Sequence, residues 1–170
     1  MNWEAIGAIG EIIGALAVVV SILYLSIQIR SNTRATKASA SFDATHSWAL
    51  SNEQAHQMSA EDIADLNASY DVDADPNVLS EVGRFRVEAF HRALFQKLEG
   101  QYFLYKYGYL EPDLWRKRSA WAHGVIVLPF YKNWWAYELK QSVYSDEFVE
   151  AVMSAESVKV SVPGGRRNDA

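Results

Sequence analysis

Glu88 and His91 are one helical turn apart, and this Glu-x-x-His pattern is a natural place to look for metal chemistry. Di-iron carboxylate bundles use two such motifs together with two further glutamates. His123 has no glutamate three residues before it, and we do not recognise the full ligand set. We therefore predict that Glu88 and His91 form a surface pair, and we predict no metal site.

Asp71, Asp73 and Asp75 match the first three ligand positions of a calcium-binding loop. The sixth position of such a loop requires glycine and the twelfth requires glutamate. Here these positions are Pro76 and Val82, so the match fails. The pattern predicts a solvated acidic turn.

The sequence contains few of the residues and motifs that covalent catalysis requires. The chain has no cysteine, which excludes thiol nucleophiles, zinc–thiolate sites and iron–sulfur clusters. No nucleophile elbow surrounds a serine, and no glycine-rich loop is suited to phosphate. The sequence predicts no cofactor and favours a role other than catalysis.

Glu99 lies in the middle of an otherwise apolar and aromatic helical segment. We expect a buried structural pair with Arg116 or Arg118 in preference to a catalytic group, because structural ion pairs are also common at such positions. The alternative is an exposed carboxylate beside Lys97.

The most distinctive segment is apolar and lies near the amino terminus. Residues 12–29 carry no charge, and extension back to residue 5 adds only Glu11 as an ionised group. A helix that spans a bilayer needs roughly 20 apolar residues. A buried core helix would show a polar face, which this segment lacks. We predict a transmembrane helix over residues 1–30.

The charges around this segment predict its orientation. No basic residue precedes it, whereas Arg30, Arg34 and Lys37 follow directly. Secretory signal peptides carry positive charge before the apolar run, so the faint cleavage pattern at residues 38–40 is not persuasive. The positive-inside rule places the carboxyl-terminal side in the cytoplasm and Trp3 at the outer interface.

Small and polar residues form one stripe along this helix. They recur at heptad spacing, at Gly7, Gly14, Ser21 and Gln28, with Gly10, Ala17 and Tyr24 three positions after the first three of them. Small residues let membrane helices approach closely, and Gly10 and Gly14 form a GxxxG pair. The stripe predicts a helix–helix interface and a homo-oligomer.

Glu11 leaves a second interpretation open. If the span begins near Ile12, Glu11 is interfacial, whereas a span from Ala5 places it inside the apolar layer, where it needs a partner or a proton. Several copies could then form a carboxylate ring in an oligomeric pore.

The remainder of the chain predicts an all-α protein. We expect a helical stalk over 31–58, a cytoplasmic helical domain over 59–157 and a flexible tail over 158–170. Ser59 and Asp62 resemble a capping box, and Asp75 with Pro76 predicts the start of a long helix to Tyr107. The residues expected on its core face are Val78, Val82, Phe85, Phe90, Leu94, Leu98 and Phe103.

Turn residues predict the later boundaries. Gly108 is placed to end the long helix, Pro112 to open the next, and Pro129 to break it. A further helix carries the aromatic pair at 134–135. The last helix begins after Ser145 and is expected to bury Phe148 and Val152.

Several blocks of the chain together resemble a family of uncharacterised bacterial single-pass inner-membrane proteins. They are the start Trp3-Glu4-Ala5-Ile6-Gly7-Ala8-Ile9-Gly10-Glu11-Ile12-Ile13-Gly14-Ala15, Gln28-Ile29-Arg30-Ser31-Asn32-Thr33, Glu99-Gly100-Gln101-Tyr102-Phe103 and Tyr144-Ser145-Asp146-Glu147-Phe148. The resemblance implies a bacterial inner-membrane location and a helical cytoplasmic domain, and it implies no activity.

Two classes of function survive. The 16 basic and 21 acidic residues give a net charge of -5, which argues against a nucleic-acid surface. The first class is a membrane-anchored, self-associating scaffold or interaction protein, in contact with lipid, with itself and with other membrane proteins. The alternative is a pore or ion-translocating assembly lined by the N-terminal helix.

Overall fold

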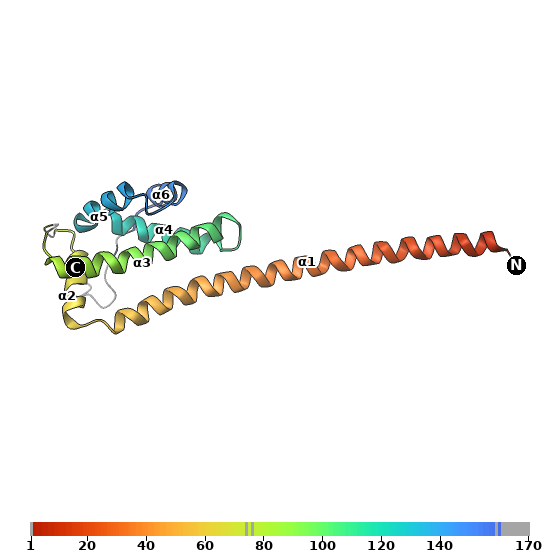
Figure 1. Ribbon diagram of the computed structural model, residues 1–170, viewed down its shortest axis with the longest axis horizontal. Coiled ribbons are helices and arrows are strands. Elements are labelled where there is room, and N and C mark those ends of the chain that lie inside the picture. Colours follow the sequence, from red (N-terminus) through yellow and green to blue (C-terminus); the bar gives the residue numbers. More distant parts are fainter. Residues whose placement is uncertain (1, 74, 76, 159, 161–170) are drawn as a thin grey trace. The chain divides into compact units, whose positions relative to one another are not determined.

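The computed structural model describes residues 2–73, 75, 77–158 and 160, and these residues form six helices and no strand. In chain order the helices are α1 (Trp3–His56), α2 (Ala60–Ser69), α3 (Glu81–Lys106), α4 (Pro112–Ile126), α5 (Pro129–Lys140) and α6 (Asp146–Met153) (Figure 1). The prediction of an all-α chain is confirmed. The chain divides into two compact units, Met1–Ser39 and Ala40–Ala170.

The first unit consists of the amino-terminal part of α1. This is the one described helix that is long and apolar enough to cross a membrane, and none of the side chains in its apolar window is buried. The helix continues without a break to His56. The predicted stalk is thus shared between the two units, because the second begins at Ala40.

The last turns of α1 belong to the core of the second unit. Ala44 and Ser51 are buried. The Gln101 side chain donates a hydrogen bond to the Ala44 carbonyl oxygen at 3.1 Å, and Lys97 donates to the Ser51 hydroxyl at 2.6 Å. These bonds join α1 to α3.

The start of α3 differs from the prediction. Ser80, and not Asp75, is the N-cap, and its hydroxyl accepts a hydrogen bond from the Gly83 amide at 3.1 Å. Asp75 instead accepts from the Asn77 amide at 2.8 Å. This local side-chain bond competes with helix formation. Pro76 lies outside the described residues.

The buried face of α3 also differs from the prediction. Leu94 and Leu98 are buried as expected, but Val82 and Phe85 are 57% and 72% exposed. The buried positions are Gly83, Val87, His91, Leu94, Phe95, Leu98 and Gln101. Apolar side chains occur around much of this helix. Two polar side chains take core positions: both ring nitrogens of His91 have partners inside the protein, and the Gln101 amide nitrogen donates to Ala44.

The turn residues act as predicted. Gly108 has φ 74°, a left-handed conformation that favours glycine, directly after the C-cap of α3. Pro112 and Pro129 are the first residues of α4 and α5, where a missing N–H costs nothing. Figure 1 shows α3 and α4 side by side and running in opposite directions.

The core is strongly aromatic. Phe95 is fully buried, and its ring centroid lies 5.3 Å from those of Trp134 and Trp135. Phe148 and Val152 of α6 are fully buried, as predicted. Apart from residues 158 and 160, the predicted tail lies outside the described residues.

Glu99 helps to position α6. One oxygen of its half-buried carboxylate accepts a hydrogen bond from the Ser145 backbone amide at 2.7 Å, at the N-cap of that helix. A carboxylate is favoured at a helix N-terminus because the exposed amides there carry partial positive charge. The expected pair with Arg116 or Arg118 is not formed among the described residues.

Candidate functional site

The predicted interface residues of the N-terminal helix all face outward from the chain. They are Gly7, Gly10, Gly14, Ala17, Ser21 and Gln28, and every one is exposed. A Cβ atom built on any of the three glycines would meet no described heavy atom within 4 Å, beyond its own helical turn. No contact with another described part of the chain therefore requires glycine at these positions.

The polar side chains on this stripe bond within their own helix. The Ser21 hydroxyl donates to the Ala17 carbonyl oxygen at 2.8 Å, and the Gln28 amide donates to the Tyr24 hydroxyl at 3.0 Å. These bonds reduce the cost of placing the stripe in an apolar medium. Glu11 is exposed on the same helix.

A polar network lies in the core of the second unit. The His91 ring is fully buried, with Nε2 at 2.9 Å from the Tyr70 hydroxyl. Its Nδ1 lies 2.9 Å from the Val87 carbonyl oxygen and 3.2 Å from the Tyr131 hydroxyl. The Tyr131 hydroxyl is in turn 2.8 Å from that of Ser69. His91 is therefore a core residue, and its predicted place in a surface pair is wrong.

The geometry indicates which ring nitrogen carries the proton. The Val87 carbonyl can only accept, so Nδ1 of His91 donates to it and Nε2 accepts from the Tyr70 hydroxyl. Burial lowers the pKa of His91 to about 4, because burial disfavours the charged form. The ring is thus neutral at neutral pH, and its role is structural.

A bidentate ion pair lies close to this network. The Glu138 side chain is fully buried, while Arg92 is 41% exposed and donates through Nε to Glu138 Oε2 at 3.0 Å. A second bond joins Arg92 Nη2 to Glu138 Oε1. The pair ties α3 to α5.

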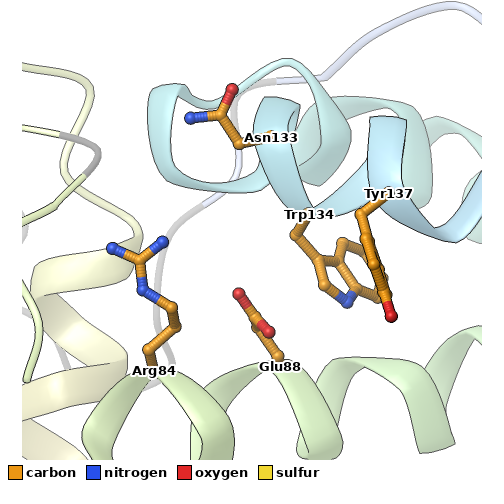
Figure 2. A pocket seen from close by; sticks show the side chains of 5 residues that line it. All are labelled: Arg84, Glu88, Asn133, Trp134 and Tyr137. Atoms are coloured by element: carbon orange, nitrogen blue, oxygen red, sulfur yellow. The ribbon is translucent and has the colours of Figure 1, made fainter. Parts of the chain in front are cut away.

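A cavity of 250 Å³ opens between α3 and α5. It is lined by Arg84 and Glu88 of α3 and by Asn133, Trp134 and Tyr137 of α5. Figure 2 shows the Arg84 and Glu88 side chains pointing toward α5, with the Glu88 carboxylate between the guanidinium and the two aromatic rings.

Two groups in this cavity are unusual. Burial raises the pKa of the Glu88 carboxyl, and the nearby charge of Arg84 opposes that rise. The Trp134 side chain is 3% exposed, and its buried Nε1 has no hydrogen-bond partner among the described residues. Buried indole N–H groups usually have a partner. The cavity brings this group together with an arginine and a half-buried carboxylate, which makes it a candidate binding site in the second unit.

The other residues that the sequence suggested for metal binding do not come together in a site among the described residues. Across the described residues, no group of three His, Asp or Glu side chains is placed to hold a metal ion. Asp71 accepts a hydrogen bond from the Asp73 amide at 2.9 Å, as a solvated turn would. Glu53 and His56 repeat the Glu-x-x-His spacing at the end of α1.

An apolar groove of 310 Å³ lies between α2 and α3. Its lining includes Leu66, Phe85 and Phe90 together with Asp65. The ring of Phe85 is 72% exposed. Exposed aromatic side chains beside an apolar groove are typical of surfaces that contact other molecules.

No protein-family model, curated protein or solved structure matches this chain in the three comparisons.

Proposed function

We propose that this chain is held in a bacterial inner membrane by the amino-terminal part of α1 and self-associates there as a scaffold or interaction protein. One observation carries the proposal: more than ten Ile, Leu and Val side chains between residues 6 and 29 are exposed. Burial of each such side chain is worth roughly 1.5–3 kcal/mol. Exposure of all of them to water would therefore cost tens of kcal/mol, whereas lipid or a second helix removes that cost.

The orientation follows from the basic residues after the span. We propose that Arg30, Arg34 and Lys37 keep the second unit in the cytoplasm. A reporter enzyme fused after Ala170 should be active in its cytoplasmic form and inactive in its periplasmic form. Activity of the periplasmic reporter at that position would contradict the orientation.

We propose that the chain self-associates through the glycine stripe, which is the row of small and polar residues that includes Gly7, Gly10 and Gly14. Gly10→Ile together with Gly14→Ile should weaken the oligomer by roughly 1–2 kcal/mol, because the added side chains prevent close backbone approach. The measurement is the mass of the full chain in detergent micelles over a range of protein-to-detergent ratios.

The control adds bulk on another face of the same helix. Ala8→Ile with Ala15→Ile introduces two isoleucines at other small positions of the helix. We expect this control to keep the wild-type mass. An equal mass of the two double variants in detergent micelles would show that the glycines do not lie in the interface.

The exposed groove between α2 and α3 supports an interaction role for the second unit as well. The pore lined by Glu11 stays a prediction from the sequence. We place it second because glycines more often bring membrane helices together than hold them apart around water.

A further inference from the structure

We propose that the cavity between α3 and α5 binds a small zwitterion of the α-amino acid class. The proposal concerns the second unit alone and does not depend on how the chain meets a membrane. It is argued from the charges in the cavity, from its aromatic wall and from its size.

The charges in the cavity favour a ligand that carries both signs over a ligand that carries a single charge. Arg84 and Glu88 are one helical turn apart on α3, and both side chains face the cavity (Figure 2). Arg84 also donates to the Asn77 side chain at 3.1 Å, but a guanidinium remains cationic whatever bonds it makes. A lone ammonium would be repelled by Arg84 and a lone carboxylate by Glu88. A ligand that carries both groups on one carbon can place each opposite its counter-charge.

The aromatic side chains supply the rest of the site. Trp134 and Tyr137 form one wall, and their rings suit both an apolar ligand body and an ammonium group. In Figure 2 the nitrogen-bearing edge of Trp134 lies on the Glu88 side of the ring. Its N–H has no hydrogen-bond partner among the described residues.

The volume limits the ligand. Pockets for drug-sized molecules are typically about 300–1,000 Å³, and this cavity has 250 Å³. A free amino acid suits that space. The exposed Asn133 amide lies at the rim and can bond to either end of such a ligand.

The test is titration of the full chain in detergent micelles, followed by tryptophan fluorescence and calorimetry. The probes are L-alanine and L-leucine. Propylamine and acetate serve as control ligands that carry only one charge. We expect saturable binding of an amino acid, and at least tenfold weaker binding of both single-charge probes. The proposal is overturned if neither amino acid saturates, or if propylamine or acetate binds as tightly as the amino acids.

Two variants locate the binding. Glu88→Gln should weaken amino-acid binding at least tenfold while thermal unfolding is unchanged, because the new side chain has the same shape and burial already disfavours the charged form. Tyr137→Ser changes a half-exposed side chain and provides a second variant if Glu88→Gln unfolds. The control, Glu150→Gln, lies exposed on α6 and should bind as the wild type does. Wild-type affinity in the folded cavity variants would show that the cavity is not the site.

Discussion

Replacement of Arg92 by alanine should lower the free energy of unfolding of the second unit by about 3 kcal/mol. The Glu138 carboxylate is fully buried, and Arg92 supplies two hydrogen bonds and the opposite charge. Removal of one partner leaves an uncompensated buried charge, which typically costs about 3–5 kcal/mol. We expect the lower end of that range because Arg92 is 41% exposed, so water can reach part of the vacated space.

Urea unfolding in detergent, followed by tryptophan fluorescence, measures this effect. The matched control is Arg116→Ala, whose partner Asp113 is 60% exposed, and we expect a loss below about 1 kcal/mol there. Addition of Glu138→Gln to Arg92→Ala should recover part of the stability, since the buried charge is then absent. An equally small loss in both single variants would show that Glu138 is not held as described.

Acidification from pH 7 to pH 4 should remove about 3 kcal/mol of stability through His91 alone. Burial lowers the pKa of this residue from 6.5 to about 4. The unfolded chain therefore takes up a proton below about pH 6.5, whereas the folded protein does so only near pH 4. The stabilisation is complete above pH 6.5 and is lost as the pH falls toward 4, at 1.36 kcal/mol per unit of pKa difference.

Two other groups with shifted pKa values affect acid stability less directly in this window. The lowered pKa of Asp113, about 2, places its effect below pH 4. The raised pKa of Glu88 acts in the opposite direction and gives some stability back as the pH falls. Unfolding free energies at four pH values test the prediction, with His91→Gln as the variant that cannot titrate. A slope that is the same in both proteins would contradict the assignment.

Local signals explain which parts of the fold could be predicted from the sequence. Gly108 and Pro112 act on their own backbone, and the Ser59–Asp62 capping box closes over a single turn, with the Asp62 amide donating to Ser59 at 3.1 Å. None of these features depends on a distant residue. The start of α3 is harder to predict from the sequence. Asp75 bonds within its own loop, and Ser80 caps the helix instead.

The buried face of α3 depends on partners far along the chain. His91 reaches Tyr131, and Gln101 reaches Ala44, at separations of 40 and 57 residues. Helical spacing does place His91 on the buried face, because it follows the buried residue Val87 by four positions. Its polar side chain suggested the surface instead. Only the partners show that its ring nitrogens are satisfied inside the protein.

The candidate cavity could not be predicted for the same reason. The Glu-x-x-His spacing relates Glu88 to His91 on the same helix, whereas Trp134 and Tyr137, which line the cavity with Glu88, come from α5. No local pattern connects these positions. The stripe on the N-terminal helix was predictable, because a regular helix places residues three and four apart on one face.

The proposed self-association can be tested most directly by cysteine cross-linking along the N-terminal helix. The chain has no cysteine of its own, so single substitutions report one position each. After oxidation in native membranes, we expect strong covalent dimers for Gly14→Cys, Ala17→Cys and Ser21→Cys, and weak ones for Ile12→Cys and Val19→Cys. Equal cross-linking at all five positions, or none at any, would contradict an interface on the glycine stripe.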